Sequence, residues 1–195
     1  MALKLYLAST SPRRKDLLTT LGIPFEVIAP SFIEQATNLP AGEEALRFAE
    51  QKARSVAPQH PDALILGCDT LIACAGQKLG KPRDAADASR ILQLLSGRTH
   101  QVHTALFLLE TKNGAFKKHL ETTRVTFRPL TDTEITAYIA TGEPFGKAGG
   151  YAIQGKARPF VTKIDGDEDA VIGLPLKVLK QWLDDDLPRF FCPDA

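Results

Sequence analysis

The feature that most restricts the fold of this chain is the alternation of short apolar segments with helix-like ones. Ser11-Pro12 offers a capping side chain and a proline at a first helical position, directly after a strand-like segment. Two long strand-like segments are separated by the turn-like "KNGA" and are expected to pair as antiparallel neighbours. The whole pattern predicts strands at 3–8, 24–29, 63–73, 103–110, 121–130 and 158–164, and helices beginning near 12, 41, 84, 131 and 176. Such an alternation, with a long hairpin, predicts an α/β fold with a mixed sheet.

Composition excludes several classes of protein. The chain has 195 residues, of which 44% are hydrophobic, and we expect a single domain over 1–195. A formal net charge of +1 argues against a nucleic-acid-binding surface. Cys68, Cys74 and Cys192 form no C-x-x-C, so neither a zinc site nor a disulfide framework is predicted. With no signal-peptide pattern and no membrane-length apolar run, we expect a cytoplasmic protein without a membrane partner.

Asp69 is the most informative single residue. It follows "LILGC", so a carboxylate interrupts an apolar strand, where an unpaired buried charge would be costly. One interpretation is a turn aspartate that accepts hydrogen bonds from nearby backbone N–H groups. The other is a carboxylate at the rim of a cleft, where it could bind a metal or orient water. Position alone does not favour either interpretation.

A second candidate site lies where the first strand meets the first helix. Ser9, Thr10 and Ser11 precede Arg13 and Arg14, and a helix start favours an anion through its N–H groups and its dipole. Two arginines indicate phosphate. The alternative is a capped helix with solvated arginines, but helix starts usually prefer acidic residues, so an anion site is favoured.

Three further polar residues have weaker individual claims. Lys52 is expected on a helix over 41–56, nearly above Ala45, because seven residues make about two turns. Lys81 precedes a proline and Glu34 lies in a polar loop, and both could be ordinary surface residues. Their positions after successive strands and helices are what would bring them towards one cleft.

Other motifs are rejected on spacing. "GQKLGK" and "GEPFGK" have only three residues between their glycines and lack the Ser/Thr of a nucleotide P-loop, which excludes a Walker-type ATPase. His100 and His103 are three apart in an expected strand and should point to opposite faces, so a shared metal is not expected. Cys68 is interpreted as a small buried residue rather than a nucleophile.

Several stretches in this order and spacing resemble the Maf family of nucleoside triphosphate pyrophosphatases. The resemblance covers about residues 3–183 and implies an elongated mixed β-sheet flanked by helices, with two lobes around a deep cleft. It also implies hydrolysis between the α- and β-phosphates of a nucleoside triphosphate with a divalent cation, Mg or Mn. The motifs that carry it are "LASTSPRRKDLLTTLG", "EQKA", "GCDT", "GKPRD", "LSGRTHQVHT", "GKAGGYAIQG" and "VIGLPL".

The resemblance also implies roles for individual residues. Asp69 matches the family's proposed proton acceptor and is expected to help Glu34 hold the metal. Lys52 and Lys81 are expected to act with Asp69 on the phosphates. The residues expected to bind the substrate are Ser9, Arg13, Arg14, Thr70 and Gln154.

Base choice is predicted from Arg13, Thr70 and Gln154. This trio matches the branch of the family that resembles dTTP/UTP pyrophosphatases, and a glutamine can accept from the imide N–H of thymine or uracil and donate to a carbonyl. Modified pyrimidine triphosphates are expected as further substrates, and a homodimer is compatible with this interpretation. Two alternatives stay open: a nucleotide-binding regulator of septum formation, and a phosphatase that removes terminal phosphates.

Overall fold

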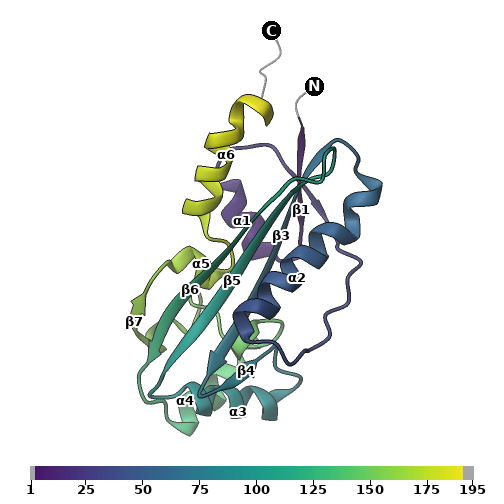
Figure 1. Ribbon diagram of the computed structural model, residues 1–195. Coiled ribbons are helices and arrows are strands. Elements are labelled where there is room, and N and C mark those ends of the chain that lie inside the picture. The colour runs from purple at the N-terminus through teal and green to yellow at the C-terminus, as the bar shows by residue number, and fades with distance from the viewer. Residues whose placement is uncertain (1–2, 191–195) are drawn as a thin grey trace. The chain divides into compact units, whose positions relative to one another are not determined.

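The computed structural model describes residues 3–190, and its strands form one mixed sheet (Figure 1). Seven strands pair among the described residues, in the order β2-β1-β3-β5-β6-β7, with β4 paired to β3. β1 (Lys4–Ala8) runs parallel to both β2 (Glu26–Ile28) and β3 (Ala63–Cys74). The sheet contains parallel and antiparallel pairs and is accompanied by helices, so the expected mixed α/β fold is confirmed.

The described residues divide into two compact units. Unit 1 comprises residues 3–69, 104–120 and 173–190, and unit 2 comprises 70–103 and 121–172. The single domain expected over 1–195 stays a prediction. Cys192, one of the three cysteines considered above, lies outside the described residues.

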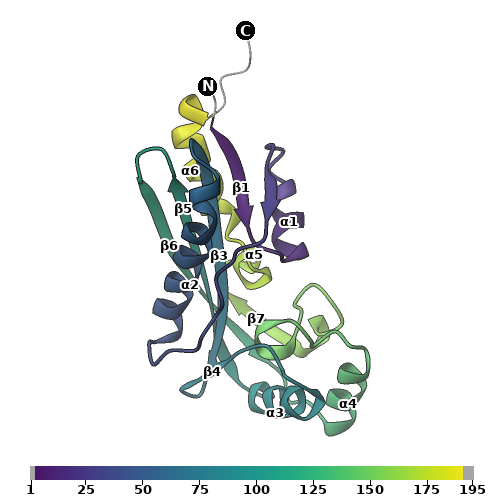
Figure 2. The ribbon, with the colours of Figure 1, turned by 90° about the vertical axis from the view of Figure 1, so that its right-hand side faces the viewer.

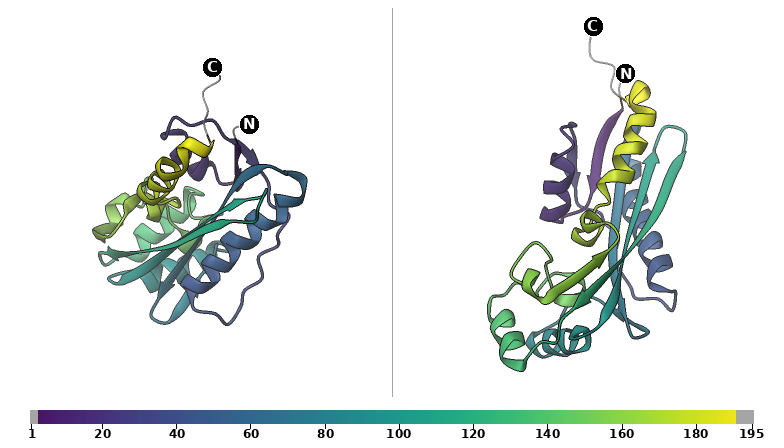
Figure 3. Two further views of the ribbon diagram at one scale, coloured as in Figure 1. Left: turned by 45° about the horizontal axis from the view of Figure 1, so that its top comes forward. Right: turned by 90° about the vertical axis from the view of Figure 1, so that its left-hand side faces the viewer.

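In unit 1 helices lie on both faces of the sheet. α2 (Ala41–Val56) lies along β3 on one face, and α1 (Pro12–Thr19) lies on the other (Figure 2). α6 (Leu176–Phe190) lies on the same side as α1 (Figure 3). Leu5 and Leu7 of β1 are buried between these layers, as the apolar pattern of the first strand predicts.

The two long strands form the expected antiparallel hairpin. β5 (Thr99–Glu110) and β6 (Phe116–Phe127) are neighbours in the sheet, joined by a tight turn. The N–H of Glu110 donates to the carbonyl of Ala115, and the N–H of Phe127 donates to the carbonyl of Arg98. Both strands begin earlier than predicted, because ladder pairing continues through polar residues that break the apolar pattern.

Unit 2 holds two helices that pack against each other. α3 (Ala85–Leu95) begins after Asp84, whose side chain accepts the N–H of Asp87. α4 (Asp132–Ala140) begins with a capping box in which Thr131 and Glu134 bond reciprocally. The remaining elements of this unit are β4 (Gln77–Leu79), β7 (Val161–Asp165), which pairs antiparallel to β6, and α5 (Glu168–Ile172). The sequence pattern predicted neither β4 nor α5, which are both short.

Candidate active site

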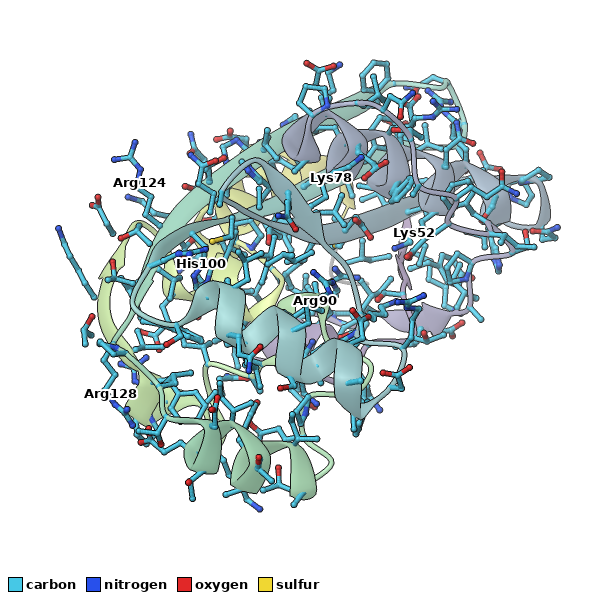
Figure 4. The ribbon with its side chains drawn as sticks, turned by 90° about the horizontal axis from the view of Figure 1, so that it is seen from below. Lys52, Lys78, Arg90, His100, Arg124 and Arg128 are labelled. Atoms are coloured by element: carbon cyan, nitrogen blue, oxygen red, sulfur yellow. The ribbon has the colours of Figure 1, made fainter. Side chains whose placement is uncertain are left out.

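An ion-pair cluster with a buried lysine and aspartate and an exposed glutamate lies in unit 1. The ammonium of Lys52, labelled in Figure 4, is 2.6 Å from Oε1 of Glu34 and 2.5 Å from Oδ1 of Asp69. Only 6% of Lys52 and 4% of Asp69 are exposed. Three residues that the sequence pointed to separately therefore meet at one ammonium, and we call them the acidic-lysine cluster.

Gly67 explains how α2 brings Lys52 so close to Asp69. A Cβ at this position would lie 2.0 Å from the carbonyl oxygen of Ala49 and 3.1 Å from the Cβ of Ala53. The helix therefore packs directly on the bare backbone of β3. Lys52 lies between these two alanines in α2, so its side chain reaches the strand two residues beyond Gly67.

The loop between β2 and α2 holds Glu34 against the helix. One buried side chain of α2, Glu44, accepts the N–H of Thr37 at 2.5 Å and its hydroxyl at 2.7 Å, both at Oε1. Nearer the start of the loop, the hydroxyl of Ser31 donates to the carbonyl of Ser55. Glu34 lies between these two attachments, which fixes it opposite Lys52.

Asp69 has an unusual electrostatic environment. Burial raises the pKa of its carboxyl above the ordinary value, while the charges of Lys52 and Arg14 oppose that shift and the charge of Glu34 adds to it. Oδ1 is bonded to Lys52, but Oδ2 is buried and has no hydrogen-bond partner among the residues that the structure describes. Of the two sequence interpretations, the turn aspartate bonded to backbone is therefore not what the structure has.

The Ser9–Arg14 cluster is held by a network that the sequence did not predict. The N–H of Ser11 donates to Oγ of Ser9 at 3.2 Å, and Nη1 of Arg14 donates to the same oxygen at 3.3 Å. Nε of Arg14 donates to the carbonyl of Gly173 at 3.0 Å. Ser11 is the N-cap residue of α1, but its side chain makes no capping bond, so the expected capping by Ser11 is wrong. The oxygen of Ser9 accepts the N–H of the N-cap residue itself and does not replace a capping bond to the first turn of α1.

Arg13, Thr70, Lys81 and Gln154 are less enclosed. Arg13 lies in the first turn of α1 and is half-buried, and it belongs to unit 1. The other three belong to unit 2: Thr70 is half-buried in β3, and Lys81 and Gln154 are exposed in loops.

Two rejections from sequence agree with the geometry. Burial raises the pKa of the Cys68 thiol to about 11, which keeps it protonated and unreactive at neutral pH. His100 and His103 point to opposite faces of β5: His100 is buried and bonded to the hydroxyl of Tyr151 at 2.8 Å, and His103 bonds to Thr122 on the open face.

The residues of this site fit a hard divalent cation that takes few ligands from the protein and the rest from phosphate oxygens and water. Within residues 3–190 no group of three or more His, Cys, Asp or Glu is placed to hold a metal by itself. Glu34 and Asp69 supply two carboxylates that meet at one ammonium. Mg²⁺ is commonly bound in this way, by one or two carboxylates together with substrate phosphates and water.

Comparisons with known proteins are consistent over nearly the whole chain. A family model described as "Maf-like protein" matches residues 4–185. A protein of Carboxydothermus hydrogenoformans is 45% identical over 92% of this chain and 99% of its own length, and one of Moorella thermoacetica is 47% identical over 92% and 93%. A protein of Salmonella typhimurium is 48% identical over 88% and 87%. All three are named dTTP/UTP pyrophosphatase. No helix within the described residues is long and apolar enough to cross a membrane.

Proposed function

Because the chain belongs to the family of Maf-like proteins, we propose that it is a nucleoside triphosphate pyrophosphatase that hydrolyses dTTP and UTP. The products are the nucleoside monophosphate and pyrophosphate, formed by cleavage between the α- and β-phosphates. The observation that carries this proposal in the structure is the buried carboxylate of Asp69, paired through one oxygen with Lys52 and unpaired at the other among the described residues.

Asp69 is suited to accept a proton from an attacking water. Its raised pKa brings a carboxylate nearer to the basicity that a general base needs, while the ammonium of Lys52 favours the ionised form. Lys52 occupies Oδ1 and so leaves Oδ2 as the oxygen that can take the proton. Asp69 is the base in this proposal, and Lys52 orients it.

The cations of the site neutralise the substrate. A triphosphate carries close to four negative charges and gains more on the leaving pyrophosphate, so prearranged positive groups lower the barrier. Arg14 is fixed by the carbonyl of Gly173 and by Ser9, which reduces the entropy lost when it binds a phosphate. We assign Ser9, Arg13 and Arg14 to the phosphates of the substrate, with a further role for Arg13 in base preference.

Glu34 and Asp69 are the residues we assign to a divalent cation, Mg²⁺ or Mn²⁺. When bound, the cation would act as a Lewis acid that withdraws charge from the phosphate oxygens. Lys52 pairs with both carboxylates and therefore holds them together.

Residues of unit 2 complete the proposal. We assign Lys81 to the phosphates, and Thr70 and Gln154 to the base, on the match of their motifs to the family. The two-lobed fold with a deep cleft that this family resemblance implies stays a prediction.

A panel of nucleoside triphosphates with Mg²⁺, scored for pyrophosphate and orthophosphate, tests the activity. We expect dTTP and UTP to release pyrophosphate faster than the other nucleotides. Orthophosphate as the first product would instead indicate the terminal phosphatase, and tight binding without any turnover would indicate the nucleotide-binding regulator.

Asp69→Asn tests the mechanism. We expect turnover to fall by at least about a hundredfold, the usual lower value for loss of a general base, while dTTP still binds. Asp62→Asn is the matched control, because Asp62 is an exposed aspartate of the same unit that lies at a loose 3.7 Å from the ammonium of Lys112. Turnover near wild type in Asp69→Asn would remove Asp69 from the catalytic role.

A further inference from the structure

Gln154 lies at the tip of a tight turn in unit 2. The N–H of Gly155 donates to the carbonyl of Ala152 at 3.0 Å, which closes a four-residue turn with Gln154 in its third position. Ile153, the residue before it, is 3% exposed, whereas Gln154 is exposed. The turn therefore anchors one side chain in the core and presents the next to solvent.

Two side chains from outside the turn hold both of its ends. Tyr138 on α4 donates its hydroxyl to Oε1 of Glu143 at 2.9 Å, and the same hydroxyl accepts the N–H of Ala152 at 3.2 Å. The other oxygen of Glu143 accepts the N–H of Lys156 at 3.1 Å. We call this pair the Tyr138–Glu143 clamp, because it fixes the residue that begins the turn and the residue that follows it.

Gly155 shows how closely the clamp touches the turn. A Cβ on Gly155 would lie 2.5–2.6 Å from the carboxylate atoms of Glu143. No ordinary side chain fits in that space unless the carboxylate moves away. Glycine at position 155 therefore leaves the space that the carboxylate of Glu143 occupies.

The clamp is itself held in place. Tyr138 is 3% exposed, and its ring packs edge to face against Phe160 at 5.2 Å between centroids. The N–H of Glu143 donates to the hydroxyl of Thr141, and the carbonyl of Glu143 accepts the ammonium of Lys147 at 2.6 Å. The tyrosine is fixed by burial and the glutamate by its backbone, so the turn is attached to the body of unit 2 rather than suspended in a loose loop.

We propose that Tyr138 and Glu143 are positioning residues for base selection, which they exert by fixing the turn that presents Gln154. This proposal rests on the proposed function, in which Gln154 reads the pyrimidine. Hydrogen-bond readout of a base is directional and weakens steeply with misalignment, so a displaced turn loses discrimination before it loses phosphate binding. Neither residue needs to touch the nucleotide.

The test compares kcat/KM for dTTP with that for dCTP, because thymine and cytosine present opposite donor and acceptor groups at positions 3 and 4 of the edge they use for base pairing. Glu143→Gln keeps the size of the side chain but replaces one acceptor oxygen by an NH₂ group, and Tyr138→Phe removes only the hydroxyl. We expect each variant to lower the dTTP-to-dCTP ratio by about tenfold, which corresponds to roughly 1.4 kcal/mol. Glu168→Gln, a change of an exposed glutamate paired with Arg158 in the same unit, should leave the ratio unchanged.

Combination with Gln154→Ala separates positioning from general damage. If the clamp acts through Gln154, Glu143→Gln should lower the ratio no further once Gln154 is alanine. Additive losses, or an unchanged ratio in both clamp variants while Gln154→Ala lowers it, would overturn the proposal. A ratio unaffected by Gln154→Ala would overturn it too by removing the base-reading role, yet pyrophosphate release from dTTP would still support the proposed activity. Thermal melts of all variants check that the fold is retained.

Discussion

Gly67→Ala tests the close contact that builds the acidic-lysine cluster. The added Cβ would lie 2.0 Å from the carbonyl oxygen of Ala49, and real Cβ atoms essentially never approach a heavy atom within 3.0 Å. The obstacle is backbone of α2, which cannot rotate away as a side chain can. The helix and the strand must therefore separate by about 1 Å.

The energetic cost follows from that displacement. Adding a methyl group to a well-packed interior costs about 1–3 kcal/mol, and a clash with backbone belongs at the upper end, so we expect a loss of about 2–3 kcal/mol. For a chain of this size that corresponds to a fall in Tm of roughly 4–12 °C. The same movement lengthens the 2.5 Å contact between Lys52 and Asp69, so kcat for dTTP should fall as well.

Urea unfolding and steady-state kinetics measure the two effects. Gly80→Ala is the control for stability, because a Cβ there meets no described atom within 4 Å. A Gly67→Ala protein whose unfolding free energy lies within about 0.5 kcal/mol of wild type, the range of an ordinary surface change, would refute the reasoning. It would mean that α2 does not rest on this glycine.

Two further predictions concern pH and the loop that carries Glu34. Burial lowers the pKa of His100 to about 4 in the folded protein, whereas the unfolded chain binds this proton below about pH 6.5. The stability that the protein has above pH 6.5 should therefore be lost as the pH falls towards 4. At pH 5 the expected loss in unfolding free energy is roughly 2 kcal/mol. Urea titrations at pH 7.5 and pH 5 should show a smaller loss in His100→Gln than in wild type, and equal losses would contradict this. Thr37→Val removes the hydroxyl that donates to Glu44 and accepts the N–H of Leu39, and it should loosen that loop; a net loss of about 0.5–1.5 kcal/mol would lower kcat for dTTP by about two- to tenfold. Thr19→Val, on the exposed side of α1, should have no effect on kcat, and an unchanged kcat in Thr37→Val would show that these bonds do not position Glu34.

Local patterns along the chain predicted the elements well where propensity and burial agree. The helix over 41–56 has the bounds that its apolar spacing indicates, since each turn places alanines on one face. The strand containing "LILGCDT" was expected to be interrupted at Asp69, yet β3 runs unbroken through Gly67 and Asp69. The strand continues because α2 packs on Gly67 and Lys52 pairs with Asp69. Neither partner can be identified from the residues of the strand alone.

Gly67 is a signal of this packing that the sequence itself contains. A glycine inside an apolar strand often marks a close approach of another backbone, and this one marks the position of α2. No comparable signal announces the carbonyl of Gly173 as the partner of Arg14. A backbone acceptor has no residue type of its own and is separated here by 159 positions.

The sequence by itself determined the class of fold, the family and the residue types available for phosphate chemistry, because periodicity and motif spacing are local properties of the chain. The tertiary structure alone decided that Glu34 and Asp69 share one ammonium, that the hydroxyl oxygen of Ser9 accepts from Arg14, and that the Tyr138–Glu143 clamp holds the turn of Gln154. Those contacts depend on strand register and on the distance between a helix and a sheet. Both are set by how the whole core packs, and no single segment encodes them.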